Sequence, residues 1–295
     1  MDGISLGTEY TWREARARGA TRRQIEADGV PVGRGVYVSR AVGLTLESRC
    51  RAWTRALPKD AAFSHGTAAA LFGAPGWVPP VPHVALTPRR VLPQWDDLVV
   101  HGRALAPEDV VVHRGLRLTS GAQTFLDLAA VLPPPDLVAV GDALLRAGHV
   151  TAEGLSDRLV RADRVRGVVR ARACAPLLSP LARSRPESLL RYWVVTARLP
   201  VPQPQIPIHD RGRVVAHADL GYLEWKVAME YEGRQHADAN QFGRDIDRYS
   251  LMAADGWLTL RFAAGHLQGP QIVVDRTRRA LISRGWRPPP ELQAC

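Results

Sequence analysis

The sequence "HADLGYLEWKVAMEYEGRQH", residues 217–236, combines two strand-like segments with an unusual density of acidic side chains. It places Asp219, Glu230, Glu232 and His236 within twenty residues, on segments that otherwise read as β-strand. Strand candidates at about 204–209, 213–221 and 226–232 are joined by the short connections "DRGR" and "YLEW". Short connections of this kind predict an antiparallel meander.

Side chains of a strand alternate between the two faces of its sheet. Asp219 therefore shares a face with His217, while Glu230 and Glu232 share one face of the next strand. Two adjacent strands can bring the three acids together. An alternative is that they are ordinary charges at the rim of the sheet.

Clustered carboxylates repel one another, and a fold tolerates them best when solvent, protons or a cation offset the repulsion. Oxygen-rich groups at a strand end suit Mg²⁺ or Mn²⁺, which accept one or two carboxylates and keep several waters. Such an ion polarises a phosphodiester and lowers the pKa of its bound water. The acids thus predict a Mg²⁺ or Mn²⁺ site that acts on phosphate esters.

The segments around this stretch predict alternating helices and strands. Residues 184–198 form an expected helix with Ser184 as N-cap, and Glu187 stands where a capping box places its acid. A helix at 240–257, a strand at 257–262 and a helix at 269–285 follow. The expected order from residue 184 onward is α, β, β, β, α, β, α.

Five motifs in this order resemble the Vsr-like, very-short-patch-repair branch of the PD-(D/E)XK nuclease superfamily: "ESLLR", "HADLGY", "VAMEYEGRQH", "RDIDRYSLMAADGWLTLRF" and the last helix. The resemblance spans about residues 184–286 and implies a restriction-endonuclease-like αβββαβ core. By position, Asp219 matches the motif aspartate, Glu230 the following acidic ligand and Glu187 the acid of the first helix. Glu232 stands where the superfamily has lysine.

The resemblance implies a role for each matched residue. Asp219 and Glu230 would hold a divalent cation with the Tyr231 carbonyl, and Glu187 or Glu232 would orient a metal-bound water or a second ion. Four further residues would support the site: Gln235, His236, Asp247 and Arg248. His236 would act as general base or phosphate donor, and Arg248 would stabilise developing negative charge.

The general base stays open, because the motif lysine is absent. His217 is a less favoured alternative to His236. Lys226 lies four residues from Glu230, roughly 13 Å along a strand, which is too far for a direct substitute.

The N-terminal segment "TWREARARGATRRQIEADGVPVGRGVYV", residues 11–38, predicts two short helices separated at Gly19, the second opened by Thr21, and then a β-wing. This is the layout of a winged helix-turn-helix. Arg22, Arg23 and Gln24 would begin the recognition helix, and Arg34 would lie on the wing near the DNA backbone or minor groove. The alternative is a small structural or protein-interaction domain.

This segment resembles the abortive-infection type IV antitoxin (AbiEi-like) family, together with "AAFSHGTAAALFGAP" (61–75), "VVHRGLRLTSGAQTFLDLAAVL" (111–132) and "LVAVGDALLRAGHVTAEGL" (137–155). The family pairs an N-terminal winged helix with an α/β domain. The expected divisions are a winged-helix-like DNA-binding module at 1–45, an antitoxin-like α/β domain at 46–165, a basic linker at 166–183 and a nuclease-like domain at 184–295.

The charge of the chain points to a polyanion as partner. Its 295 residues carry a formal net charge of +10, and of 39 basic residues only Lys59 and Lys226 are lysines, which leaves 39 − 2 = 37 arginines. Arginine matches phosphate geometry well, so nucleic acid is the first partner to consider. The partner is expected to be DNA, with RNA possible, and a toxin partner or a homodimer also remains possible.

Other residue types exclude several classes of protein. Cys50, Cys174 and Cys295 form neither a disulfide pattern nor a zinc-knuckle spacing. The beginning of the chain has no leader pattern and no apolar run is long enough for a membrane span, so we expect a soluble, cytoplasmic protein. Four histidines of the middle region lack metal-ligand spacing and are expected to be ordinary: His65, His83, His101 and His113.

The sequence therefore predicts an α/β (α+β) protein with a winged helix-turn-helix, a middle α/β domain and a C-terminal metal-dependent endonuclease domain. The alternative function is a non-catalytic, antitoxin-like transcriptional regulator that binds DNA with a degenerate nuclease fold. Target sequence and oligomeric state are not specified by any motif.

Overall fold

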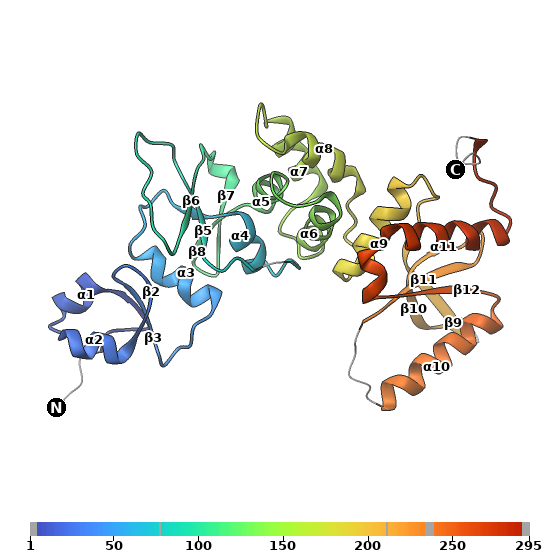
Figure 1. The fold of residues 1–295 in the computed structure, drawn as a ribbon, viewed down its shortest axis with the longest axis horizontal. Helices are drawn as coiled ribbons and strands as arrows, with labels where there is room; N and C mark the ends of the chain where they lie inside the picture. The colour runs from blue at the N-terminus through green and yellow to red at the C-terminus, as the bar shows by residue number, and fades with distance from the viewer. Residues whose placement is uncertain (1–4, 77, 211, 234–238, 291–295) are drawn as a thin grey trace. The chain divides into compact units, whose positions relative to one another are not determined.

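A computed structural model describes residues 5–76, 78–210, 212–233 and 239–290 of the chain (Figure 1). The chain divides into two compact units. Unit 1 contains residues 1–132 and 147–173, and unit 2 contains residues 133–146 and 174–295. The division does not follow chain order, because one helix of the middle region packs with the C-terminal unit.

Unit 1 begins with a small sheet and two short helices. The elements are β1 (Glu9–Thr11), α1 (Trp12–Ala17), α2 (Arg22–Asp28), β2 (Gly29–Gly33) and β3 (Val36–Ser39), and the sheet order is β1-β3-β2. Gly19 separates the helices with a φ of +86°. Thr21 caps α2 through a reciprocal capping box with Gln24, as its sequence predicts. Strand β1 was not expected.

Burial of Tyr10 fixes these elements to one another. Its ring packs with Ala15, Ala20 and Ile25, and its hydroxyl donates to Asp28 Oδ2 at 2.8 Å. The two predicted short helices are present, and the second half of the strand predicted at "GRGVYV" lies in β3, which pairs with β2. A following helix, α3 (Leu46–Thr54), carries the fully buried Trp53.

The rest of unit 1 is built on a mixed sheet of five strands in the order β6-β5-β4-β8-β7. Its strands are β4 (Ala62–Phe63), β5 (His83–Leu86), β6 (Val99–Gly102), β7 (Val110–His113) and β8 (Leu116–Thr119). The helices are α4 (His65–Leu71), α5 (Gly121–Leu128), α7 (Ala152–Val160) and α8 (Val168–Cys174). Strands β5 and β6 run parallel, as do β4 and β8.

The expected linker at 166–183 is not a bare connection, because it contains α8 and a 3-10 turn at Ala175–Leu177. Ala171 and Cys174 of this segment are buried. Arg172 donates to the carbonyl oxygens of Leu159 and Ala162, each at 2.9 Å. The Arg172 side chain therefore caps the C-terminal end of α7. The number of basic residues in the sequence does not reveal this contact.

Unit 2 holds α6 (Pro134–Arg146), α9 (Arg185–Thr196), β9 (Gln203–Asp210), β10 (Arg213–Tyr222), β11 (Val227–Glu232), α10 (Ala239–Ala254), β12 (Leu258–Ala263) and α11 (Pro270–Ser283). Helix α6 joins this unit through the buried Asp142, which accepts from Arg191 Nη2 at 2.6 Å and Ser188 Oγ at 2.7 Å. Both partners lie on α9. A buried charge needs such a partner.

The sheet of unit 2 has the order β12-β11-β10-β9. Strands β9, β10 and β11 are antiparallel neighbours, which confirms the predicted meander, and β12 runs parallel to β11 after the α10 crossover. Figure 1 shows α9 and α11 on one face of this sheet and α10 on the other, in agreement with two separate buried clusters. The predicted order α, β, β, β, α, β, α is confirmed.

Within the described residues, no helix is both long and apolar enough to cross a membrane.

Candidate functional site

The acidic cluster of unit 2 centres on Glu230 of β11, whose side chain is almost fully buried, with 2% of its surface exposed. One carboxylate oxygen, Oε2, accepts from Arg248 Nη1 of α10 at 2.9 Å. The other, Oε1, has no hydrogen-bond partner in the described part of the chain. Burial, and next to it the negative charge of Asp219, raises the pKa of Glu230 to about 8.

Asp219 stands across from Glu230 in the sheet. Leu220 pairs with Met229 in the antiparallel ladder, and Asp219 and Glu230 are the next residues outward. Asp219 Oδ2 accepts from the backbone N–H of Tyr231 at 2.8 Å. Burial raises the pKa of Asp219, which the hydrogen bond from Tyr231 only partly offsets. The expected pairing of these two acids on neighbouring strands is therefore present.

Glu187 lies in the first turn of α9 and is buried. Ser184 caps the helix as predicted, but the Glu187 carboxylate does not complete a capping box. Oε2 instead accepts from the Arg183 backbone at 2.9 Å and from Gln205 Nε2 at 3.2 Å. Burial raises the pKa of Glu187, and the nearby Asp219 adds to the rise. Glu187 thus belongs electrostatically to the cluster.

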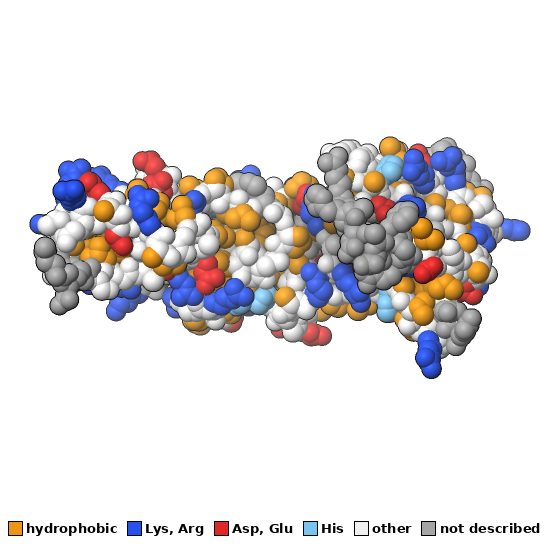
Figure 2. All heavy atoms as spheres, turned by 90° about the horizontal axis from the view of Figure 1, so that it is seen from below, with side chains coloured by type: hydrophobic (Ala, Val, Ile, Leu, Met, Phe, Trp, Pro, Cys, Tyr) orange, Lys and Arg blue, Asp and Glu red, His pale blue; other side chains and the backbone are white. Residues whose placement is uncertain are grey.

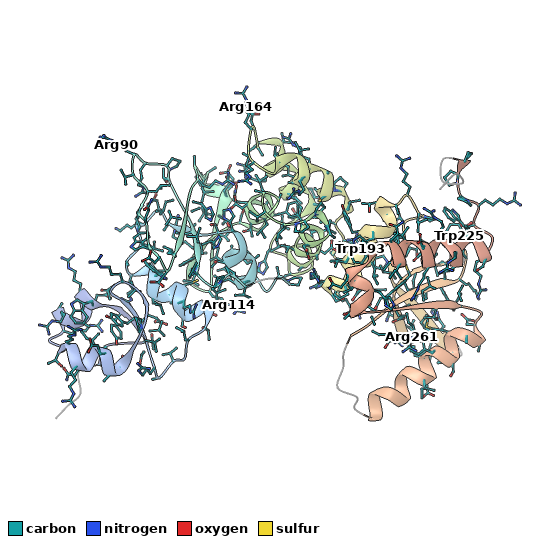
Figure 3. The ribbon with its side chains drawn as sticks, in the orientation of Figure 1. Arg90, Arg114, Arg164, Trp193, Trp225 and Arg261 are labelled. Atoms are coloured by element: carbon teal, nitrogen blue, oxygen red, sulfur yellow. The ribbon has the colours of Figure 1, made fainter. Side chains whose placement is uncertain are left out.

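Glu232 is bound by two side chains that sequence reasoning did not assign to the site. Arg261 Nε donates to Glu232 Oε1 at 2.9 Å, and the Tyr249 hydroxyl donates to the same oxygen. Burial raises the pKa of Glu232, but these hydrogen bonds and the arginine charge lower it overall. Arg261 projects from β12 toward α10 (Figure 3) and lies over the Tyr249 ring, 4.6 Å from its centroid.

The remaining residues predicted for this site are bound elsewhere, exposed, or outside the described residues. Lys226 donates to the carbonyl of Asp255 at 2.6 Å, which ties it to the end of α10 and removes it as a substitute base. His217 and Asp247 are exposed. Gln235 and His236 lie outside the described residues.

Of the predicted nucleic-acid contacts, two are used within α2 itself. Arg22 pairs with Glu26 at 2.7 Å, and Gln24 accepts from the Thr21 backbone at 2.8 Å. Arg23 is exposed on the same helix, and Arg34 is exposed in the turn between β2 and β3.

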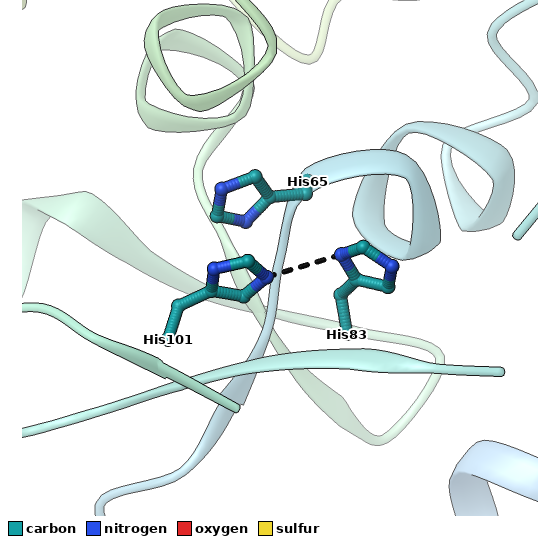
Figure 4. A group of neighbouring side chains, drawn as sticks. All are labelled: His65, His83 and His101. Carbon is teal, nitrogen blue, oxygen red and sulfur yellow. Dashed lines mark hydrogen bonds between the residues drawn. The ribbon is translucent and has the colours of Figure 1, made fainter. Parts of the chain in front are cut away.

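A second cluster lies in unit 1 and was missed, because the sequence interpretation treated its residues as ordinary histidines. Ligand atoms of His65, His83 and His101 all lie within 4.8 Å of one another (Figure 4). The rings of His65 and His101 stack with centroids 3.8 Å apart, and His101 Nε2 is 3.1 Å from His83 Nδ1. Within the described residues, no other three histidine, cysteine, aspartate or glutamate side chains bring their ligand atoms close enough to share a metal ion.

Three elements position the histidines. The parallel register pairs His83 with Val99 and Ala85 with His101, so His83 and His101 are diagonal neighbours on one face. His65 begins α4 directly after β4, with a φ of +52°. Such a conformation is costly for a residue other than glycine. His83 and His101 are 18 residues apart in sequence, so they do not form a short-spaced ligand pair such as H-x3-5-H.

Asp127 of α5 lies beside this group and is fully buried. Its Oδ1 accepts from Gln123 Nε2 at 2.8 Å and from Arg103 Nη2 at 2.9 Å. Its Oδ2 has no hydrogen-bond partner in the described part of the chain and is 3.9 Å from His65 Nδ1. Burial lowers the pKa of His65 to about 3 and that of His101 to about 4. Both imidazoles are therefore neutral at physiological pH.

The chain is a mixed α/β protein, and its described residues include the acidic cluster around Glu230 and the histidine cluster of His65, His83 and His101. No protein-family model matches it. Two curated proteins of Mycobacterium tuberculosis do: the uncharacterized protein MT2308 of strain CDC 1551 / Oshkosh and the uncharacterized protein Rv2248 of strain ATCC 25618 / H37Rv. Each is 30% identical over 215 residues, which cover 72% of this chain and 74% of the relative. The chain belongs to the family of these mycobacterial proteins.

Among solved structures, the crystal structure of the RV2827C protein from Mycobacterium tuberculosis is similar with a TM-score of 0.41. It is 15% identical in sequence and covers 68% of this chain and 79% of its own.

Proposed function

We propose that this protein binds DNA and that unit 2 hydrolyses phosphodiester bonds with the help of a divalent cation. The observation that carries the proposal is the pair Asp219 and Glu230 on adjacent strands, where Glu230 has a buried oxygen without a hydrogen-bond partner. A buried polar atom without a partner calls for an explanation, and a bound ion is one of the explanations that apply. The same two residues occupy the ligand positions that the Vsr-like resemblance implies.

The residues fit a hard cation. They offer oxygen only. Burial raises the pKa of both carboxyl groups, and the negative charge of Asp219 adds to the rise for Glu230, so a cation would offset the cost of ionising them. Asp219, Glu230 and the Tyr231 carbonyl would hold Mg²⁺ or Mn²⁺, which supplies polarisation of the phosphodiester and activation of water.

Side chains around the acids have separate tasks in this proposal. Arg248 holds Glu230 on one oxygen and leaves Oε1 available, and its guanidinium provides positive charge for a phosphate. Glu187 and Glu232 would orient water at the edges of the site. The base stays open between His236 and another group.

Binding of DNA is supported by the charge of the chain. Figure 2 shows arginine and lysine side chains on the visible face of both units. Arg23 and Arg34 are exposed on the helix and the turn where a winged helix meets its duplex. We take DNA as the partner, with RNA possible, and a cytoplasmic protein as the setting.

A specific observation also favours the second candidate, a regulator with a degenerate nuclease fold. Glu230 and Glu232 are each bound by an arginine, at 2.9 Å to Arg248 and 2.9 Å to Arg261. Such contacts hold both side chains in place without a metal ion, as a retired site would.

Cleavage of supercoiled plasmid with Mg²⁺ or Mn²⁺ distinguishes the two candidates. We expect nicking or linearisation by the wild-type protein, and a loss of at least about 100-fold in rate for Asp219→Asn and Glu230→Gln, since both remove a ligand charge. Asp247→Asn is the matched control, because Asp247 is an exposed acid on α10. If plasmid stays intact with every divalent ion while gel retardation persists in EDTA, the regulator is the correct function.

A further inference from the structure

We propose that His65, His83 and His101 form a binding site for a divalent transition-metal ion, with Zn²⁺ as the main candidate, and that Asp127 positions His65. The site lies in unit 1 and is independent of the acidic cluster of unit 2.

The first support is convergence from separate elements. His65 comes from the start of α4, His83 from β5 and His101 from β6, and their ligand atoms lie within 4.8 Å of one another. Ligands of one tetrahedral Zn²⁺, at about 2.0–2.1 Å from the metal, are separated by about 3.3 Å. The ligand atoms are therefore near the required spacing, and the stacked rings of His65 and His101 would tilt out of the stack to point at one ion. The three histidines are far apart in the sequence. Their proximity therefore comes from tertiary packing and not from local structure.

The second support is how the backbone at His65 and His83 is held. The Ser64 backbone donates to the His83 carbonyl at 2.9 Å, and the His83 backbone donates to Thr67 Oγ1 at 2.8 Å, which ties β5 to the start of α4. His65 keeps a φ of +52° at this junction. Backbone strain of this kind gathers at binding sites, because the surrounding structure must stabilise it.

Asp127 provides the independent observation that points to a ligand. It is fully buried, and its Oδ2 faces His65 Nδ1 at 3.9 Å without a hydrogen-bond partner in the described chain. Metal-bound histidines commonly donate their second ring N–H to a carboxylate, which fixes the ring. His65 Nδ1 now lies 3.0 Å from Ser64 Oγ. A rotation of the ring would let Nδ1 donate to Asp127 instead and leave Nε2 for the ion.

The donor set selects the class of metal. Three imidazoles suit Zn²⁺, Cu²⁺ or Ni²⁺ and suit Mg²⁺ or Ca²⁺ poorly. Three protein ligands leave a fourth position for water or another small ligand. His83 and His101 are only partly buried, so that position has access to solvent. The charge of Arg103 opposes a cation here, and Asp127, which binds Arg103 at 2.9 Å, offsets it.

Zinc titration of the full-length chain without a histidine tag tests the site, after EDTA treatment and desalting. Competition with a chelating dye should show one high-affinity Zn²⁺ per chain and no competition by Mg²⁺. His83→Ala and His101→Ala should each weaken binding by more than about 100-fold, since loss of an outer partner alone costs about 10- to 100-fold. Asp127→Asn should weaken it by about 10- to 100-fold.

His113→Ala is the matched control, because His113 is a partly buried histidine of the same unit that packs on Phe72 and His149 instead. It should bind Zn²⁺ as the wild type does. Failure of Mg²⁺ to compete for the bound Zn²⁺ separates this site from the proposed cleavage site.

X-ray absorption at the zinc edge of the wild-type protein keeps the test independent of how the variants fold. About three imidazole ligands are expected around the ion. A shell of oxygen ligands, absence of stoichiometric Zn²⁺ binding, or unchanged affinity in folded His83→Ala and His101→Ala variants would overturn the proposal.

Discussion

At the scale of single residues, Glu230 shows how burial changes an acid. Its neighbours are Asp219, which disfavours the charged form, and Arg248, which favours it. Burial is the largest cause, so the pKa rises to about 8. Linkage then ties the stability of unit 2 to pH, because the folded state holds a proton that the unfolded state releases.

The sign of this effect follows from the raised pKa. The folded pKa is about 8, above the ordinary value of 4.5, so the contribution is fully present below about pH 4.5 and is lost as pH rises through 8. Glu230→Gln removes this dependence. We expect the variant to gain at least about 1.4 kcal/mol over the wild type between pH 5 and 9, the equivalent of one pKa unit.

Urea unfolding in EDTA at several pH values measures this difference. If the free energies of unfolding of the wild type and of Glu230→Gln change with pH in the same way, the Glu230 carboxyl group does not hold an extra proton in the folded protein.

At the scale of elements, a close approach joins the N-terminal sheet to α3. Gly33 of β2 lies against Trp53, and an added Cβ would be 2.3 Å from Trp53 Cζ2. Trp53 is fully buried, so it has little room to move. Gly33→Ala should therefore destabilise unit 1 by about 1–3 kcal/mol, the usual cost of overpacking.

Thermal unfolding compares Gly33→Ala with Gly102→Ala, where the new methyl group meets only the end of the Leu92 side chain at 3.3 Å. Gly102→Ala should have a smaller effect. Equal midpoints for both variants would mean that Trp53 does not pack on Gly33 in solution.

At the scale of the whole molecule, the DNA-binding proposal depends on the positive charge of the chain and on which of its arginines are exposed. Arg23 and Arg34 are exposed in unit 1, while many other arginines serve the fold, such as Arg158, which pairs with the buried Asp109 at 3.1 Å. Net charge therefore overstates the number of available phosphate contacts. Specific positions should matter more than total charge.

Arg23→Ala combined with Arg34→Ala tests this directly. If each arginine contacts one phosphate, the slope of log affinity against log salt should fall in magnitude by about 2. The double variant Arg90→Ala and Arg164→Ala removes the same charge from exposed loop positions of unit 1 (Figure 3) and should change the slope less. Fluorescence anisotropy with a DNA duplex at several salt concentrations provides the measurement. Equal slopes for both double variants would remove the N-terminal module from the DNA interface.

The sequence by itself determined the local structure and part of the acidic site. Thr21 and Ser184 cap their helices as predicted, because a cap depends on groups within three residues of each other. Asp219 and Glu230 could be paired from strand alternation and a short connection, since both act over a few residues.

Only the tertiary structure decided which distant side chains meet. Arg261 reaches Glu232 from β12, and His65, His83 and His101 converge from three elements of unit 1. Neither the Arg261–Glu232 contact nor the histidine cluster follows a short-range pattern in the sequence. Packing of a sheet and its helices brings residues together whatever their spacing in the chain. Helix α6 folds with unit 2 for the same reason: the buried charge of Asp142 needs Arg191 as its partner.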